Sequence, residues 1–266
     1  MQTFEQSTLV PGVRRFHAAE IGSTNTEALV RAALGETGPL WITADQQTGG
    51  RARSGRSWTS PVGNLAASLL VTLPCGPEVA HHLALLAGVA LVDAIRDAGV
   101  VSEANVPMYV KWPNDVLIGG AKVSGILAES TSHTPGHLTA VIGFGVNIAG
   151  EPDDVDRAVT SLSRHVKPDA IQPTADSLLV HLAQRMQHWL SVWNCGKDFA
   201  SIRNAWLERS FQSGTVMSVN FGDGRHEGFF AGLDSDGALL LGDERGQRHR
   251  ITYGDVTIES AHGREG

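Results

Sequence analysis

The chain has 266 residues, of which 42% are hydrophobic, enough for one sizeable domain and a small second one. A formal net charge of −7 argues against general affinity for nucleic acid, and no apolar run approaches membrane-spanning length. With two cysteines in no close-spaced motif and no apolar signal core at the amino terminus, the composition predicts a cytoplasmic protein with reduced thiols.

Up to about residue 212, helical and strand patterns follow one another without a regular strand–helix succession. In chain order they predict a helix at 23–34, strands at 39–46 and 64–73, a helix at 78–99, three strands within 108–149, and helices at 174–193 and 198–210. Strands in succession beside helices argue for an α+β domain built on a mixed sheet.

Two of these helices carry end signals. Thr24 and Glu27, three residues apart, fit a capping box at the start of the first helix. Gly99 follows the last apolar residues of the long helix and is expected to end it.

From Ser213 onward, short alternating segments are separated by turn signals of the types Gly-Asp-Gly, Asp-Ser-Asp-Gly and Asp-Glu-Arg-Gly. They predict four or five strands at the spacing of a small SH3-like barrel. We therefore expect two domains, 1–212 and 213–266.

The segment "TGGRARSGRSWTSP" is the most unusual stretch of the chain. Between Asp45 and Glu78 there is no acidic residue, and Arg51, Arg53 and Arg56 are the only charges. Glycines free the backbone, while arginine offers fixed bidentate donors to carboxylates and phosphates. The stretch fits either an anion-binding loop that closes over a ligand or a solvated surface turn. It is neither a Walker A motif nor a Gly-x-Gly-x-x-Gly fingerprint.

Four further segments combine polar residues and glycines, and each also has a plain structural interpretation. "GSTN" (22–25) could present N–H groups and hydroxyls to a polar ligand, or simply cap a helix. "KWPND" (111–115) could hold phosphate and magnesium, or form a hairpin turn. Alternation puts Lys122 and Ser124 on one face of a strand, where the lysine is either exposed or turned into a site. In "GFGVN" (143–147), glycines in a strand indicate close approach of a ligand or of another part of the chain.

Other features are discounted as functional signals. His81 and His82 have no acid or cysteine at metal-ligand spacing, and Asp234–Gly237 lacks the later ligands of a calcium loop. Three tryptophans follow helical spacing and are interpreted as packing residues: Trp189, Trp193 and Trp206.

Taken in order, "STN", "GGRARSGRSW", "KWPND", "GAKVSGIL" and "IGFGVN", with a small β domain behind them, closely resemble the biotin protein ligases (biotin–acetyl-CoA-carboxylase ligases). The resemblance covers essentially the whole chain. It implies a catalytic domain similar to that of class II aminoacyl-tRNA synthetases, followed by an SH3-like domain. It also implies that the chain joins biotin to ATP as biotinoyl-5′-AMP, releases pyrophosphate, and passes biotin to one lysine of the carboxyl carrier protein of an acyl-CoA carboxylase.

The resemblance carries residue roles over motif by motif. For biotin it implies Ser23, Thr24, Asn25, Gln47, Gly50, Arg51, Lys122 and Gly125. For ATP and the adenylate it implies Arg51, Arg53, Arg56, Trp58, Lys111, Asn114 and Asn147. Lys122, Arg51, Arg53 and Asp115 are the expected catalytic residues. Mg²⁺ is expected to bind mainly through phosphates, with Asp115 as the one candidate protein ligand.

The sequence departs from the family pattern at Ala52, where the usual loop has a second glycine. We expect altered loop dynamics and retained chemistry, because alanine removes backbone freedom but no donor. Many bacterial relatives also carry an amino-terminal DNA-binding domain that represses biotin synthesis genes. Only about twenty residues precede "STN" here, so no DNA partner is expected.

Two other functions were weighed. A lipoate or octanoate ligase shares the catalytic fold, but its glycine-rich motif with a nearby His-Asp pair is not found. A non-catalytic protein that holds an anion or a nucleic acid with the arginine loop would leave Lys122 and the Lys-Trp-Pro-Asn-Asp motif without a task.

Overall fold

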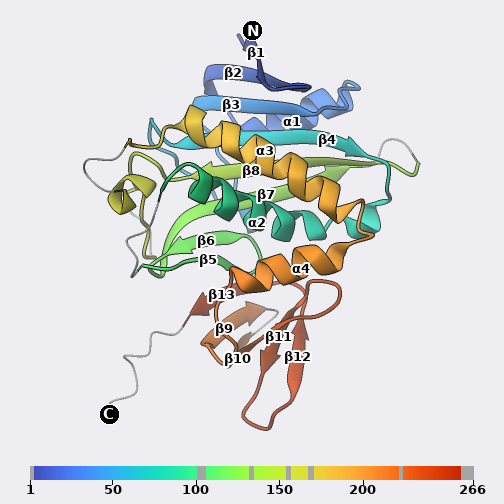
Figure 1. Cartoon of the computed structure of the whole chain (residues 1–266), viewed down its shortest axis with the longest axis vertical. Helices are drawn as coiled ribbons and strands as arrows, with labels where there is room; N and C mark the ends of the chain where they lie inside the picture. Colours follow the sequence, from blue (N-terminus) through green and yellow to red (C-terminus); the bar gives the residue numbers. More distant parts are fainter. Residues whose placement is uncertain are drawn as a thin grey trace.

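The computed structural model describes residues 3–100, 106–131, 135–153, 157–166, 171–221 and 224–258. An eight-stranded sheet and a five-stranded sheet follow one another along the long axis of the molecule (Figure 1). The change of pattern expected after residue 212 falls between the last helix, which ends at Glu208, and the first strand of the smaller sheet, which begins at Val216. The exact domain boundary stays a prediction.

The larger sheet is mixed, as the strand and helix order predicted. Its strands run in the order β1-β2-β3-β4-β8-β7-β6-β5, and of these pairs only β2 and β3 are parallel. The bounds are β1 Glu5–Val10, β2 Val13–Ile21, β3 Leu40–Gln47, β4 Leu65–Leu73, β5 Met108–Lys111, β6 Asp115–Ile118, β7 Ala121–Thr131 and β8 Leu138–Val146. Strands β1 and β2 were not predicted from the sequence, and the segment 108–149 contains four strands where three were predicted.

Helices cover both faces of this sheet. α2 (His82–Asp97) and α3 (Ala175–Trp193) lie on one face, with α4 (Phe199–Glu208) at its lower end, and α1 (Thr24–Ala33) lies on the opposite face (Figure 1). Alternation along β3 serves both layers: Leu40 and Ile42 pack with α1, whereas Trp41 belongs to the cluster of α2 and α3. A sheet buried on both faces explains why β4 is almost continuously apolar. Of the described helices, none is long and apolar enough to cross a membrane.

One of the two expected helix ends is displaced by a residue. Ser23, not Thr24, is the N-cap of α1, and its hydroxyl accepts a hydrogen bond from the N–H of Thr26 at 3.4 Å. Glu27 pairs with Arg31 one turn later instead of returning to the cap. Gly99, with φ of 72°, follows the C-cap of α2 as predicted.

The smaller sheet is antiparallel, with the order β12-β11-β10-β9-β13. Its bounds are β9 Val216–Phe221, β10 Gly224–Leu233, β11 Leu239–Gly242, β12 Arg248–Ile251 and β13 Asp255–Ile258. The Asp-Ser-Asp-Gly signal forms the turn between β10 and β11, where the Asp234 carboxylate accepts from the N–H groups of Asp236 and Ala238. The first two residues of the Gly-Asp-Gly signal lie outside the described residues.

The two sheets are joined by a shared apolar cluster and by polar contacts. Trp206 of α4 packs against Phe230 of β10, with ring centroids 6.3 Å apart. Trp112 donates its indole N–H to the carbonyl of Gly237 at 3.1 Å. Nε and Nη2 of Arg203 both donate to the carbonyl of Leu233. The smaller sheet is therefore positioned firmly against the ends of β5 and β6.

Candidate active site

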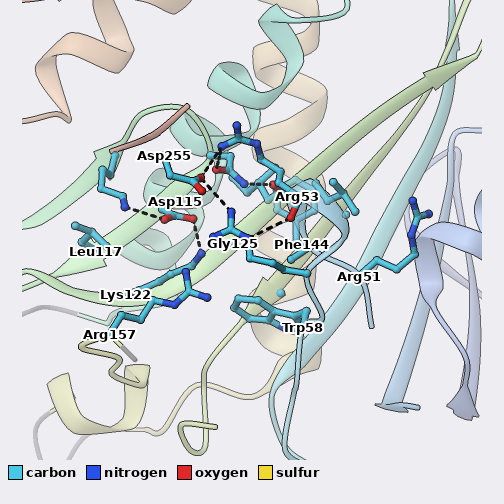
Figure 2. Close-up of a pocket in the computed structure, with 18 of the residues that line it drawn as sticks. Arg51, Arg53, Trp58, Asp115, Leu117, Lys122, Gly125, Phe144, Arg157 and Asp255 are labelled. Atoms are coloured by element: carbon cyan, nitrogen blue, oxygen red, sulfur yellow. Dashed lines mark hydrogen bonds and ion pairs between the residues drawn. The ribbon is translucent and has the colours of Figure 1, made fainter. Parts of the chain in front are cut away.

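A cavity of about 510 Å³ opens between the N-terminus of α1, the arginine loop, the ends of β6 to β8 and strand β13 (Figure 2). It brings together almost every residue that the sequence motifs singled out. These are Ser23, Thr24, Asn25, Gln47, Arg51, Arg53, Arg56, Trp58, Lys111, Asn114, Asp115, Lys122 and Gly125. Gly50 and Asn147 are the two expected site residues that do not line it.

One end of the cavity is lined by uncharged polar groups. The N–H and hydroxyl of Thr24 lie 2.8 and 3.1 Å from the side-chain oxygen of Gln47. Ser68 of β4, which the sequence analysis did not select, lies 2.7 Å from the Thr24 hydroxyl and 2.5 Å from Asn25 Oδ1. These buried amides and hydroxyls orient one another, as a site for an uncharged polar ring requires.

The arginine loop has a defined turn conformation. Arg51 and Ser57 form an isolated bridge, and the N–H of Ala52 donates to the carbonyl of Arg56 at 2.8 Å. Ala52 has φ of −124° and ψ of 177°, an extended conformation that any residue adopts, so no glycine is needed there. Gly50 differs, because a Cβ at that position would lie 2.2 Å from the carbonyl oxygen of Trp58.

All three loop arginines have partners that come from distant strands. Arg51 forms two hydrogen bonds, of 2.8 and 3.1 Å, with the carboxylate of Glu129 on β7. Arg56 pairs with Asp255 of β13 at 3.0 Å. Arg53 donates to Asn114 Oδ1 at 3.0 Å and to a backbone carbonyl that precedes β13. The loop looks uncompensated in the sequence, but tertiary structure supplies its counter-charges.

Trp58 lies in a groove that strand glycines leave open. A Cβ on Gly145 would lie 2.3 Å from the indole, and one on Gly125 would lie 3.1 Å from it. Lys122 Nζ is 5.5 Å from the ring centroid, a cation–π contact. Gly143 serves Asn25 in the same way, since its Cβ would lie 2.1 Å from the Asn25 amide. The glycines of "GFGVN" therefore accommodate two side chains of the site.

The cationic end of the cavity centres on Asp115. This buried carboxylate lies 2.5 Å from Lys122 Nζ and 3.1 Å from Lys111 Nζ (Figure 2). Burial alone would raise the pKa of Asp115, but the two lysines hold it below its usual value. Burial lowers the pKa of Lys122, and Asp115 opposes that shift. The three groups carry a net charge of +1, and they sit where an anionic ligand would reach them.

A β-bulge turns Lys122 into the cavity. Val116 of β6 pairs with Ser124 and Leu117 pairs with Lys122, so Val123 is an extra residue on β7. Lys122 and Gly125 therefore share the cavity, whereas Ser124 is buried and donates to the carbonyl of Gly145 at 2.7 Å. The prediction that Lys122 and Ser124 share a face was wrong, because simple alternation fails across a bulge.

Asn147 does not line the cavity but lies behind it, where it forms hydrogen bonds with neighbouring backbone. Asn147 is 1% exposed. Its backbone N–H donates to the carbonyl of Val123 at 2.9 Å, and its side-chain Nδ2 donates to the backbone carbonyl of Thr160 at 3.1 Å. It thereby fastens the strand that carries the bulge. A contact between Asn147 and a nucleotide stays a prediction.

Several cavity residues gave no signal in the sequence. Arg157 and Leu117 line the cationic end, and Phe144 lies on its floor (Figure 2). Asp255 reaches the cavity from β13, and Glu129 lies just behind Arg51, beside a smaller pocket under the loop. Phe144 lies within the "GFGVN" segment, although no role was assigned to it, and the other residues belong to none of the motifs, so only the tertiary structure brings them to the site.

A second group of ionisable residues lies between α2 and the smaller sheet. His81, His82 and Asp236 each place one ligand atom within 4.8 Å of the others. Trp193 donates its N–H to His82 Nδ1 at 3.1 Å, which puts the proton of the neutral ring on Nε2. Burial, aided by the neighbouring His81 and opposed by Asp236, lowers the pKa of His82 to about 4. With Nε2 protonated, His82 has no lone pair to offer a metal ion, so the group does not fit a metal site.

The sequence is similar to a known protein family and to individual members of it. A family model described as the biotin/lipoate A/B protein ligase family matches residues 20–147. The chain is 36% identical to a biotin–[acetyl-CoA-carboxylase] ligase of Paracoccus denitrificans, over 84% of this chain and 92% of that protein. It is 33% identical to a protein of the same description from Mycobacterium tuberculosis, over 90% and 86% of the two chains.

Solved structures share the fold. A biotin protein ligase from Aquifex aeolicus in complex with biotin and ATP matches with a TM-score of 0.73 at 24% identity, covering 92% of this chain and 99% of that one. A ligase from Leishmania major in complex with biotinyl-5-AMP matches with a TM-score of 0.59 at 24% identity, covering 92% of this chain and all of that one.

Proposed function

The chain belongs to the biotin protein ligases of the biotin/lipoate A/B protein ligase family, and we propose that it activates biotin with ATP and attaches it to a carrier protein. In the first step biotin and ATP give biotinoyl-5′-AMP and pyrophosphate. In the second step one lysine of the biotin carboxyl carrier protein of an acyl-CoA carboxylase takes the biotinoyl group and AMP leaves. One observation carries the proposal: a single cavity joins a pocket of uncharged amides and hydroxyls to a cluster of arginines and lysines.

The uncharged end suits the ring of biotin. The ureido group presents two N–H donors and one carbonyl acceptor, which need a site that offers both acceptors and donors. Ser23, Thr24, Asn25 and Gln47 supply such groups at this end. Trp58, lying across Gly125 and Gly145, provides an apolar surface next to them for the hydrocarbon chain.

The cationic end suits the reacting anions. An oxygen of the biotin carboxylate attacks the α-phosphorus of ATP, and the bond to the pyrophosphate oxygen breaks. Two anions must approach each other, so fixed cations that stabilise the charge on the phosphoryl oxygens lower the barrier. We assign this task to Arg51, Arg53 and Lys122, which all line the cavity. Lys111 and Asn114 face the nucleotide, and Arg56 with Trp58 completes the loop over the product.

The carboxylates that could coordinate Mg²⁺ at the described part of the site are already paired with basic side chains. Each oxygen of the Asp115 carboxylate faces a lysine, at 2.5 and 3.1 Å, and the carboxylates of Glu129 and Asp255 face arginines. Of these three carboxylates at the described part of the site, none is free for a divalent cation. We propose that Mg²⁺ arrives with the phosphates of ATP and that Asp115 serves to orient the two lysines.

The second step needs a lysine in its neutral form, since only the free amine can attack the mixed anhydride. The free pKa of a lysine is ~10.4, so a proton must be lost first. We assign no residue of this chain as the base. We place the reaction in the cytoplasm, in keeping with the free thiols of Cys75 and Cys195, and include no nucleic acid among the partners.

The proposal is tested by substrate-dependent pyrophosphate release. The protein is incubated with Mg²⁺-ATP and, in separate reactions, biotin, lipoate or octanoate, and pyrophosphate and trapped acyl-adenylate are measured. We expect release with biotin only. Release with lipoate or octanoate and none with biotin would refute the proposal.

Two variants locate the chemistry. Arg51→Ala and Lys122→Ala should each lower the rate of adenylate formation at least ~tenfold, because each removes a cation from the reacting centre. Arg96→Ala, a half-exposed arginine away from the cavity, is the matched control. Near-normal rates in the first two variants would show that the reacting centre lies elsewhere.

A further inference from the structure

Glu129 connects the arginine loop to the uncharged end of the cavity, although no motif marks it. Its carboxylate accepts hydrogen bonds from both terminal nitrogens of Arg51, at 2.8 and 3.1 Å. The same carboxylate accepts from Asn25 Nδ2 at 2.9 Å. Its side chain is 23% exposed, so solvent does not fully screen these contacts.

The contact with Asn25 fixes the direction of an amide in the ring pocket. Asn25 Nδ2 also donates to the carbonyl of Leu127 at 3.1 Å, so two acceptors lie on the nitrogen side of this amide. Its oxygen therefore faces Ser68 Oγ and the backbone of Gly143. Because the orientation of Asn25 depends partly on Glu129, the charge on β7 affects the uncharged end of the cavity.

The contact with Arg51 has the same two-point geometry that a substrate carboxylate would use. A guanidinium whose two terminal nitrogens already bind one carboxylate cannot bind a second in the same way. An incoming anion must therefore displace Glu129 from Arg51 or share the guanidinium with it. Displacement of Glu129 from Arg51 does not require loss of the hydrogen bond between Glu129 and Asn25.

We propose that Glu129 is a positioning residue that holds Arg51, and with it the arginine loop, at the cavity and yields Arg51 to the substrate anion. This inference rests on the proposed function. Glu129 acts as an internal substitute for the substrate carboxylate, because it occupies the two terminal nitrogens of Arg51 that a substrate carboxylate would use. The cost of displacing it lowers the affinity for anionic ligands relative to neutral ones of the same shape.

The test compares biotin with biotinamide, its uncharged amide, by calorimetric titration of wild type and Glu129→Gln. Glutamine keeps the shape and an acceptor for Asn25 but no longer competes as an anion. We expect the ratio of biotin affinity to biotinamide affinity to rise about two- to fivefold, the factor that corresponds to one partly exposed ion pair. Equal changes for both ligands would mean a merely structural role and would overturn the proposal.

A second readout follows the loop directly. Limited trypsin digestion at the loop arginines should be faster in ligand-free Glu129→Gln than in ligand-free wild type, and biotin should restore protection. Glu27→Gln is the matched control, because Glu27 pairs with Arg31 at the same side-chain exposure of 23% and lies outside the cavity. Unchanged digestion of Glu129→Gln would overturn the holding role.

A double-mutant cycle separates this mechanism from simple charge repulsion. If Glu129 acts through Arg51, Glu129→Gln should leave the affinity ratio unchanged in an Arg51→Ala background. A ratio that still rises there would overturn the proposal. Glu129→Asp, which retains the charge, should stay closer to wild type than Glu129→Gln. Failure of the proposed function is distinct from these outcomes, since wild type would then neither bind biotin nor release pyrophosphate.

Discussion

At the scale of single residues, Asp115 is the group on which the cationic end of the cavity depends. It is 8% exposed, and it is the counter-charge shared by Lys111 and Lys122. Removing one partner of a buried ion pair leaves an uncompensated charge, which typically destabilises a protein by ~3–5 kcal/mol. Asp115 therefore contributes to stability as well as to the arrangement of the site.

Asp115→Asn should lower the free energy of unfolding by ~3 kcal/mol at neutral pH. Lys122 and Lys111 outweigh the effect of burial and lower the pKa of Asp115 below its ordinary value of 3.8 in the folded protein, so its ionised form stabilises the fold above that pH. This contribution is lost as the pH falls through the folded-state pKa. Urea unfolding at several pH values should show the gap between wild type and variant narrowing in acid.

The matched control for this prediction is Asp97→Asn. Asp97 pairs with Arg185 at the surface, where its side chain is 32% exposed, and such pairs contribute ~0–1 kcal/mol. The interpretation would be contradicted if Asp115→Asn changed the free energy of unfolding as little as Asp97→Asn does, or if the difference between wild type and Asp115→Asn stayed constant on acidification.

At the scale of elements, strands β7 and β8 shape the site through glycines without side chains and through a β-bulge. Gly143 and Gly145 leave room on β8 for Asn25 and for the indole of Trp58. The bulge at Val123 on β7 redirects Lys122 toward the cavity. A regular pair of strands with ordinary side chains would fill the cavity and turn the lysine away from it.

Gly145→Ala should displace Trp58 and weaken biotin binding by ~tenfold, since overpacking typically costs 1–3 kcal/mol. Its Cβ would lie 2.3 Å from the indole, too close for the ring to remain. Calorimetric titration with biotin measures the effect. Gly150→Ala, whose Cβ would meet nothing within 4 Å, is the control. Unchanged biotin affinity in Gly145→Ala would show that Trp58 does not form the binding surface.

At the scale of the whole molecule, the smaller sheet completes the site that the larger sheet carries. Lys111 donates to the carbonyl of Val256 at 2.9 Å, and Asp255 pairs with Arg56 of the loop. The apolar cluster that begins under α2 and α3 continues to Phe230 and Val256. Both sheets thus share one core and one cavity.

The shared core predicts a single cooperative unfolding transition. All six tryptophans lie within the first 212 residues, so their fluorescence reports mainly the larger domain and, through Trp112 and Trp206, its contact with the smaller sheet, whereas far-ultraviolet circular dichroism reports both domains. We expect the two signals to coincide in urea, as two-state unfolding requires. Separate transitions would show that the smaller sheet unfolds independently and that the contacts across the interface are weak.

Much of this arrangement could be read from local sequence. Periodicity located α2, α3, α4 and the buried strands, because the spacing of apolar residues depends on the element itself. The motifs located thirteen of the cavity residues, because the polar and glycine residues of a site cluster in short segments at strand ends. The edge strand β1 and its neighbour β2 were missed, because β1 is mostly exposed and the sequences of both strands show only a weak alternation of apolar and polar residues.

The sequence by itself determined the α+β class, the family resemblance and the composition of the arginine loop, all of which depend on neighbouring residues. Only the tertiary structure decided the partners of that loop. Glu129 and Asp255 lie 78 and 199 positions away from the arginines they bind. Sheet order and domain packing bring them there, so the acid-free loop is electrostatically paired by carboxylates that no local segment supplies.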